Sequence, residues 1–298
     1  MTTSGRTVPE TEPPAPSGGD DAPAVLRYTA FSTDPAGGNL AGVVLDASRL
    51  DEARMLAIAA EVGYSETAFV TAADGRTLDV RYFSPKAEVA FCGHATVAAA
   101  VATAERTGPG DLLFRTRAGE VPVTVEAGPD GILRATLTSV EPHTEPVADA
   151  VLTEALAALR WPAGDLDPAF PPRIAYAGNR HLVLAAADRA RLADLDYDYD
   201  RLTALMTSLD LTTVQLVWRE SAAVYHVRDP FPVGGVVEDP ATGAAALAFG
   251  AYLRELGPVP AHLTLHQGED LGRPGVLHVE LRPGDTRVRV SGAAVAIG

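Results

Sequence analysis

Two short stretches of this sequence combine residue types that could bind an anion and move a proton. They are Phe91-Cys92-Gly93-His94-Ala95-Thr96 and Glu238-Asp239-Pro240-Ala241-Thr242-Gly243, and an alanine-rich segment follows each of them. A glycine in front of such a segment predicts a turn from a strand into a helix, whose first N–H groups are free to bind an anion. Because the two stretches share this pattern, we expect a chain of two similar halves with a functional site between them.

Four side chains in or near these turns are candidates for chemistry, and each has a structural alternative. Glu66 precedes an apolar strand, where burial would raise its pKa and suit it to acid–base catalysis, or it is a solvated strand end. Cys92 is either a reactive thiol at a helix N-terminus or a small buried apolar residue. His94 could donate to a substrate carboxylate or cap a helix. Asp239 could accept from the substrate or cap the helix that begins near Thr242.

Composition restricts the class of protein. The 298 residues are enough for two domains, and no dinucleotide, phosphate-loop or nucleophile-elbow motif occurs. A net charge of −15 opposes binding to nucleic acid and to anionic membranes. Cys92 is the only cysteine, which excludes an intrachain disulfide and paired-cysteine zinc and favours a cytoplasmic location. His262 and His266 fall on an alternating, strand-like segment without a third ligand, so we expect no metal site.

Periodicity predicts an α+β fold with the same order of elements in both halves. Residues 1–24, rich in Pro, Gly, Ser, Thr and acidic residues, are interpreted as a disordered tail. Residues 25–142 form the expected N-terminal half and residues 143–286 the C-terminal half, and the last strand, about 287–298, could join the first half. Pro142–Pro146 is interpreted as the linker. The predicted helices are Asp51–Val62, the segment after Gly93, Leu152–Leu159, Leu202–Leu209 and a segment that Asp239 opens and Gly257 ends.

Taken as a set, the motifs of this chain resemble the PhzF-like family of phenazine-biosynthesis type, in order from about Val25 to the C-terminus. They are Gly38-Asn39, Ser65-Glu66-Thr67, Arg81-Tyr82-Phe83-Ser84-Pro85 with Glu88, the two turns described above, and Gln267-Gly268 with Gly272-Arg273-Pro274. The resemblance implies the diaminopimelate-epimerase fold, in which two pseudo-symmetric halves each roll a sheet around a central helix and the active site lies between them. It also implies a homodimer that needs no cofactor.

The resemblance assigns roles residue by residue. The implied positions are the catalytic glutamate at Glu66, its neighbouring serine at Ser65, the substrate-holding glycine and histidine at Gly93 and His94, the active-site aspartate at Asp239, and the backbone donor of the second turn at Gly243. Ala244 stands where the family commonly has a serine, so a hydroxyl that would contact the substrate is missing. Cys92 stands where related racemases carry one of two catalytic thiols. Since a second cysteine does not exist, Cys92 is expected to line the pocket, and a two-thiol racemase is excluded.

The expected activity is a cofactor-independent isomerisation of a small cyclic or unsaturated, amino-acid-like carboxylate. Glu66 would remove a proton, the two helix N-termini would stabilise the charge that develops, and Glu66 would return the proton at a different carbon. His94 and Asp239 would orient the substrate. The resemblance implies secondary metabolism, in a pathway of the phenazine or alkylproline type. Two alternatives stay open: an epimerase with Glu66 and Cys92 on opposite faces of one carbon, and a binding protein that has kept the fold without activity.

Overall fold

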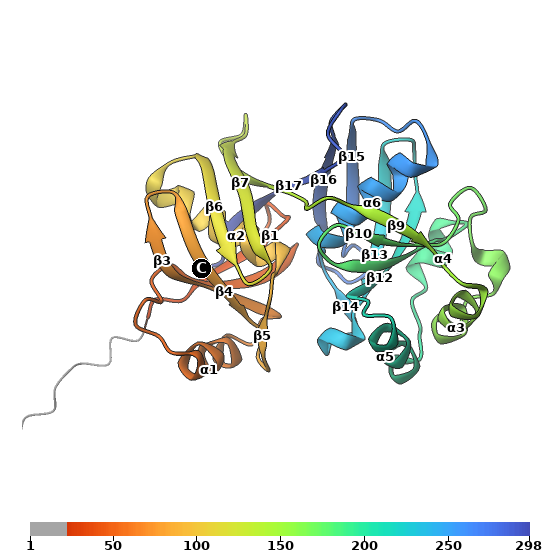
Figure 1. Ribbon diagram of the computed structural model, residues 1–298, viewed down its shortest axis with the longest axis horizontal. Coiled ribbons are helices and arrows are strands. Elements are labelled where there is room, and N and C mark those ends of the chain that lie inside the picture. The colour runs from red at the N-terminus through yellow and green to blue at the C-terminus, as the bar shows by residue number, and fades with distance from the viewer. Residues whose placement is uncertain (1–22) are drawn as a thin grey trace, which may run out of the picture.

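The structure, a computed structural model, describes residues 23–298, so residues 1–22 of the predicted tail lie outside the described part. Two halves lie side by side, each with a helix enclosed by strands (Figure 1). The predicted α+β class is therefore confirmed. Within residues 23–298, no helix is both long and apolar enough to cross a lipid bilayer.

The first half is a closed ring of strands around helix α2 (Gly93–Thr107). Hydrogen-bonded neighbours run β1-β2-β3-β4-β6-β7-β8-β17, and β17 pairs again with β1. The strands of this ring are β1 (Leu26–Ala30), β2 (Asn39–Val44), β3 (Glu66–Asp74), β4 (Thr77–Phe83), β6 (Gly110–Thr116), β7 (Gly119–Ala127), β8 (Leu133–Thr138) and β17 (Val288–Ala296). A short strand, β5 (Glu88–Val89), pairs with β4 and leads into α2.

The second half repeats this order around helix α6 (Gly243–Leu256). Its strands are β9 (His143–Pro146), β10 (Arg173–Tyr176), β11 (Arg180–Ala185), β12 (Thr213–Arg219), β13 (Val224–Pro230), β15 (His262–Gln267) and β16 (Gly275–Leu281), which pairs with β17. The parallel pairs are β2–β3 and β4–β6 in the first half and β11–β12 and β13–β15 in the second. The short strand β14 (Glu238–Asp239) pairs with β13 as β5 pairs with β4. Equivalent strands thus deliver the chain to equivalent helices, as the two repeated turns predict.

Small side chains allow each sheet to enclose its helix. In α2 the alanines at positions 95, 98, 99, 100 and 102 are all fully buried, because strands surround the helix. Alanine has the highest helix propensity and needs the least room, so it suits a helix buried on every side. In α6, a Cβ at Gly250 would lie 2.8 Å from a methyl group of Val288, so this glycine lets β17 approach the helix.

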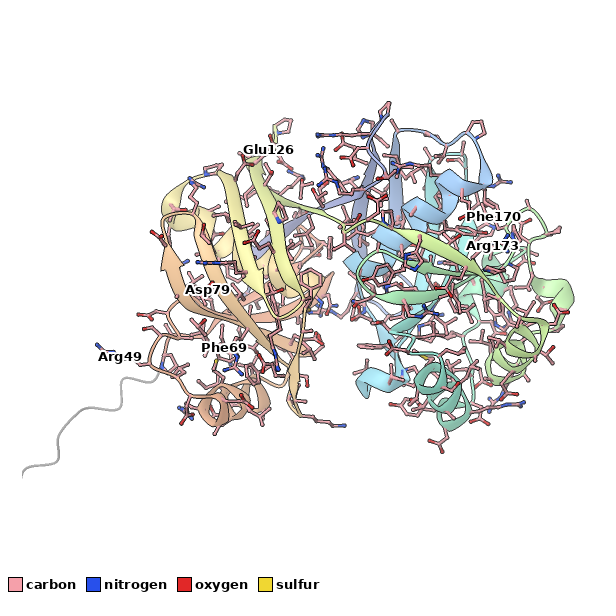
Figure 2. All side chains as sticks on the ribbon, viewed as in Figure 1. Arg49, Phe69, Asp79, Glu126, Phe170 and Arg173 are labelled. Carbon is pink, nitrogen blue, oxygen red and sulfur yellow. The ribbon has the colours of Figure 1, made fainter. Side chains whose placement is uncertain are left out.

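The remaining helices cover the outside of the two halves. Helix α1 (Glu52–Val62) packs on the first half through Met55 and Ile58, against Phe69 of β3, which Figure 2 labels. Helices α3 (Asp149–Leu159) and α5 (Tyr199–Ser208) pack on the second half and contact each other. A short helix, α4 (Arg189–Ala193), and two 3₁₀ turns, η1 (Ala163–Asp165) and η2 (Pro232–Gly234), complete the second half.

One prediction about an element boundary is wrong. The expected linker at Pro142–Pro146 is strand β9 over its last four residues, and it pairs antiparallel with β10. The second alanine-rich helix begins at Gly243, which confirms the start expected near Thr242, and Asp239 lies before it because Glu238 and Asp239 pair with Pro230 and Asp229 of β13. Strand β17 pairs with β16 of the second half and with β1 and β8 of the first, so the C-terminal strand joins both halves. The exact domain boundary stays a prediction.

Candidate active site

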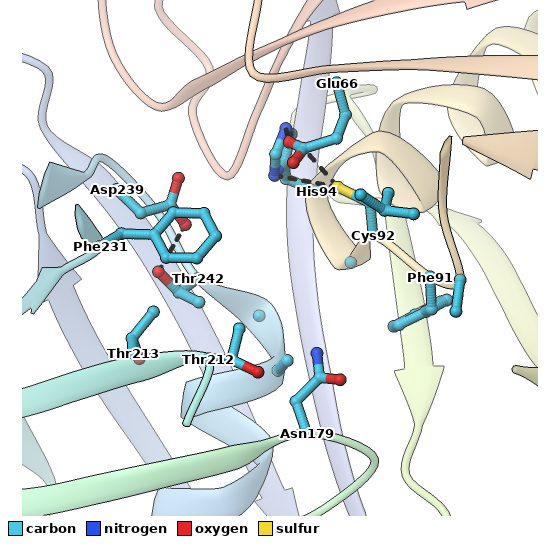
Figure 3. A pocket seen from close by; sticks show the side chains of 15 residues that line it. Glu66, Phe91, Cys92, His94, Asn179, Thr212, Thr213, Phe231, Asp239 and Thr242 are labelled. Carbon is cyan, nitrogen blue, oxygen red and sulfur yellow. Dashed lines mark hydrogen bonds and ion pairs between the residues drawn. The ribbon is translucent and has the colours of Figure 1, made fainter. Parts of the chain in front are cut away.

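A cavity of about 250 Å³ lies between the two halves, at the N-terminal ends of both central helices. The first half lines it with Glu66 of β3 and with the residues from Val89 to His94. The second half contributes Asp239, the start of α6, and side chains from three further segments. Figure 3 shows these residues converging from the two halves. The site is therefore formed only when both halves are in place.

The first turns of α2 and α6 face each other at close range. A Cβ built on Gly93 would lie 3.6 Å from the backbone nitrogen of Ala244 and 3.7 Å from the Cα of Gly243. The first residue of α2 thus contacts the first turn of α6, and both helices present free N–H groups and the positive ends of their dipoles to the cavity. We call this pair of helix N-termini, at Gly93 and Gly243, the anion cradle. It can hold a carboxylate or a developing oxyanion.

Glu66 reaches the cavity from the first residue of β3. Its register with Ala41 of the parallel strand β2 fixes the backbone there. The side chain is 12% exposed, and Oε2 lies 3.4 Å from Nε2 of His94. Burial raises the pKa of Glu66, and hydrogen bonds from Ser65 and Cys92 oppose part of that shift. The solvated alternative for Glu66 is therefore wrong, and its carboxyl is poised to exchange a proton nearer neutral pH.

His94 connects the carboxyl of Glu66 to the opposite half. Its Nε2 lies 3.3 Å from Oγ of Ser65, and its Nδ1 lies 3.1 Å from Nδ2 of Asn39. In the tautomer in which Nδ1 accepts from Asn39, the proton of the neutral ring lies on Nε2, the nitrogen that faces Glu66. Burial lowers the pKa of His94, which favours this neutral form. His94 thus faces the carboxyl of Glu66 at 3.4 Å and is not a helix cap, since Cys92 occupies the N-cap position of α2.

Asp239 is held by three buried polar side chains. Asn39 donates to Oδ1 at 2.7 Å, and the hydroxyl of Thr242 donates to Oδ2 at 2.6 Å. Gln267 fastens this turn, since its Nε2 donates to the carbonyl of Asp239 and its Oε1 accepts from the N–H of Thr242. Burial raises the pKa of Asp239 to about 6, although His94 and Thr242 act in the opposite direction. Thr242, not Asp239, occupies the N-cap position of α6.

Cys92 is a neutral, buried thiol beside Glu66 and His94. Its Sγ lies 3.4 Å from Nδ1 of His94, and burial together with the nearby Glu66 raises its pKa well above the ordinary value. Ligand atoms of Glu66, Cys92 and His94 all lie within 4.8 Å of one another, and such O, S and N donors could bind zinc. Cysteine binds metals as the thiolate, so a metal here would have to displace the proton that Cys92 carries in the metal-free site. We therefore interpret the group as an acid–base cluster.

The structure brings the predicted site residues together. Seven of them line the cavity: Glu66, Cys92, Gly93, His94, Asp239, Gly243 and Ala244. Ser65 does not line it but contacts the ring of His94. Ala244 presents a methyl group at the first turn of α6, at the position where the resemblance implies a serine. The catalytic and binding roles assigned to these residues stay predictions.

Several residues of the site carry no clear signal in the sequence. The second half lines the cavity with Asn179, Thr212, Thr213 and Phe231, which come from loops and strand starts far apart in the chain. Asn39 and Gln267, which hold Asp239 and its turn, fell within the motifs of the resemblance but had no predicted role. Long-range strand pairing places all six, so no local pattern could have singled them out.

A buried polar cluster lies behind the wall at Thr213. The hydroxyl of Thr213 donates to Oδ1 of Asp229 at 2.8 Å and lies 2.8 Å from Nδ1 of His181. Asp229 is fully buried beside Asp239 in the β13–β14 pair, and its Oδ2 has no partner among the described residues. Burial raises the pKa of Asp229 well above the ordinary range. The group therefore stays protonated over a wide pH range.

Comparisons with known proteins cover both halves. The family model of PhzC-PhzF, phenazine biosynthesis-like protein, matches residues 28–298. The chain is 34% identical over 287 residues to the uncharacterized isomerase YddE of Escherichia coli O157:H7, covering 92% of this chain and 96% of the relative. It is 31% identical over 279 residues to the trans-2,3-dihydro-3-hydroxyanthranilate isomerase of Pseudomonas chlororaphis, covering 90% and 95%.

A solved structure of a family member has a similar fold. The phenazine biosynthesis protein of the PhzF family from Bacillus anthracis has a TM-score of 0.82 to this chain at 26% identity, and the match covers 92% of this chain and 96% of the other. Together with the matching strand order of the two halves, this similarity confirms the predicted diaminopimelate-epimerase-like fold.

Proposed function

Because the chain belongs to the PhzC-PhzF family of phenazine biosynthesis-like proteins and is an enzyme of the isomerase type, we propose that it moves one proton, and with it a double bond, on a small cyclic or unsaturated carboxylate. Glu66 acts first as the base and then as the acid. One observation carries this proposal: the buried carboxyl of Glu66 lines the same cavity as the anion cradle. A proton acceptor and a site for the developing charge therefore meet at one bound molecule.

The cradle supplies the binding energy for the substrate carboxylate. Among the described residues that line the cavity there is no lysine or arginine, so the positive ends of α2 and α6, with their free backbone N–H groups, are the counter-charge available to an anion. A cavity of about 250 Å³ lies below the usual volume range of sites for drug-sized ligands, which favours a single ring or a short chain. The substrate class is thus a small carboxylate of amino-acid size.

Proton transfer follows from the position of Glu66. Its carboxylate takes a proton from a carbon conjugated to the carboxylate-bearing double bond, and the electron pair of the broken C–H bond moves into that conjugated system. The N–H groups of the cradle stabilise the added charge. The protonated Glu66 then gives the same proton to the far end of the system, so the double bond shifts and no proton is gained or lost. The Nε2 proton of His94 orients Glu66 throughout.

The geometry does not favour the two alternatives. A pair of groups that attacks opposite faces of one carbon must lie on opposite sides of the substrate. Glu66 and Cys92 instead lie on the same side of the cavity and contact the same imidazole (Figure 3). A binding protein without activity would have no need of a buried carboxyl beside a neutral imidazole, since burying such a group costs stability.

The test is the pair of variants Glu66→Gln and Glu66→Asp. The probe panel includes trans-2,3-dihydro-3-hydroxyanthranilate, on which the Pseudomonas chlororaphis relative acts by name, and unsaturated cyclic amino acids. We expect Glu66→Gln to lose roughly 10²- to 10⁴-fold in kcat with any probe the enzyme turns over. Glu66→Asp should retain part of it, and Glu61→Gln on the exposed face of α1 serves as the control. Full activity in Glu66→Gln would overturn the proposal. Secondary metabolism, a homodimer and a cytoplasmic location stay predictions.

A further inference from the structure

The cavity has two chemically different ends. Glu66, Cys92 and His94 lie at one end, and Asn179 and Thr212 of the second half lie at the other (Figure 3). The first end contains every titratable side chain that the first half contributes. The second end offers an amide and a hydroxyl, which carry no formal charge and can both donate and accept.

The backbone holds these two polar side chains in fixed places. Asn179 lies in the turn between β10 and β11, where Gly178 has a φ of +117° and the N–H of Ala177 donates to the carbonyl of Asn179. Thr212 directly precedes β12, and its N–H donates to the carbonyl of Arg180 at 2.8 Å. The parallel pairing of β11 with β12 thus joins the two positions, so the polar end is part of the sheet and not of a free loop.

Neither side chain is used inside the protein. Among residues 23–298, the amide of Asn179 and the hydroxyl of Thr212 make no hydrogen bond to another residue. Thr213, the next residue, differs sharply, because its hydroxyl is already engaged by His181 and Asp229. At Ala244, in the first turn of α6, only a methyl group lines the cavity. Asn179 and Thr212 therefore offer hydrogen-bonding groups to a polar substituent of a substrate that reaches this end of the cavity.

We propose that Asn179 and Thr212 form a specificity subsite that recognises a neutral hydrogen-bonding substituent, such as a hydroxyl, on the substrate ring. This inference rests on the proposed function and extends it. The substrate carboxylate lies in the cradle, and the substituent lies at the opposite end of the ring. An ammonium group fits this end poorly because neither partner carries a negative charge.

The test uses inert ligands, so that binding is measured apart from turnover. Benzoate and its 2-, 3- and 4-hydroxy isomers are small cyclic carboxylates that differ by one hydroxyl, and calorimetry at pH 6 gives their Kd values. We expect one isomer to bind about 3- to 10-fold more tightly than benzoate, the range of one or two neutral hydrogen bonds. In Asn179→Ala and Thr212→Val this preference should disappear, while benzoate affinity stays unchanged. Thr212→Ser should restore it, and Thr153→Val on α3 is the matched control.

The possible outcomes separate the two proposals. If all isomers bind the wild type no better than benzoate, if none of the four ligands binds, or if the preference survives in both variants, the subsite is overturned. If the preference behaves as expected but Glu66→Gln keeps full turnover, the subsite stands and the acid–base role of Glu66 fails. Thermal unfolding of each variant shows whether a lost preference comes from misfolding, and Asn179→Ala decides the case if Thr212→Val is unstable.

Discussion

The substitution Gly93→Ala should make the protein more stable and nearly inactive. Gly93 is the first residue of α2, and its φ is not positive, so an alanine can take this conformation. The added Cβ would meet its nearest neighbours, the backbone of Gly243 and Ala244, at 3.6 to 3.9 Å, which is ordinary van der Waals contact. The methyl group therefore fits the folded protein. It occupies the space in which the cradle would hold a carboxylate.

Both effects have an expected size. Replacing glycine by alanine at a compatible position raises the free energy of unfolding by about 0.4–1 kcal/mol, which for a chain of this length shifts Tm up by about 1–4 °C. A methyl group that excludes the carboxylate from one N–H removes a hydrogen bond to a charged group, worth about 1.5–3 kcal/mol, so kcat/KM should fall roughly 10- to 150-fold. A rise in Tm together with a fall in kcat/KM is the result expected of Gly93→Ala if the cradle binds the substrate.

Substitutions at two other glycines serve as controls, one for replacing glycine at an exposed site and one for adding a Cβ in the core. Gly164→Ala, at an exposed 3₁₀ turn with open space around its Cβ, should change neither activity nor folding by much. Gly250→Ala places a Cβ at 2.8 Å from Val288 and should lower Tm without a specific loss of kcat/KM per folded molecule. If Gly93→Ala retains wild-type kcat/KM, the cradle does not bind the substrate and the reasoning is refuted.

Three further predictions concern the titratable groups. Because Glu66 must be ionised to accept a proton and burial raises its pKa, kcat/KM should fall as pH decreases, with an apparent pKa above 4.5; a value at or below 4.5 would contradict this assignment. Cys92→Ala should change activity by less than about threefold, since the neutral thiol only lines the pocket, and treatment with a chelator should have as small an effect. A hundredfold loss of activity in either assay would point to a metal or a catalytic thiol. Asp229 has a folded-state pKa above its unfolded value, so its contribution to stability is full below about pH 4 and is lost as pH rises toward the raised pKa. We expect denaturation at pH 4.5, 6 and 8 to show that the free energy of unfolding of Asp229→Asn rises relative to that of the wild type as pH rises. Free energies of unfolding that change in parallel with pH would contradict a buried neutral carboxyl.

The sequence predicts the central helices and their turns well because those signals are local. A glycine before a run of alanines specifies where α2 starts, and the same pattern specifies α6 to within a few residues. Helix α1 also matches, since Asp51 accepts from the N–H of Arg54 at its start and Gly63, with a φ of +71°, ends it. Each of these features depends on residues close together in the chain.

Features that depend on distant pairing were missed or wrong. Nothing near Pro142 indicates that the segment pairs with β10, because the partner strand lies some 30 residues away. The position of the Asp239 side chain depends on a hydrogen bond from Asn39, 200 residues earlier, and the periodicity of a single sequence cannot reveal such a contact. Asn179 and Thr212 meet only because β11 and β12 are parallel neighbours. The resemblance identified Glu66, whereas the residues around it gave no means to decide between buried and solvated.

The position of a deuterium label tests the central claim most directly. The enzyme is incubated in D₂O with a substrate from the panel, and NMR locates the deuterium in the product and in recovered substrate. Proton return by Glu66 predicts isomerised product that is unlabelled when the same proton is returned and that carries deuterium at the newly protonated carbon when Glu66 exchanges first. With Glu66→Gln it predicts neither isomerised product nor label in any species. Inversion with deuterium at the original carbon, or labelling that persists in Glu66→Gln, would contradict the account.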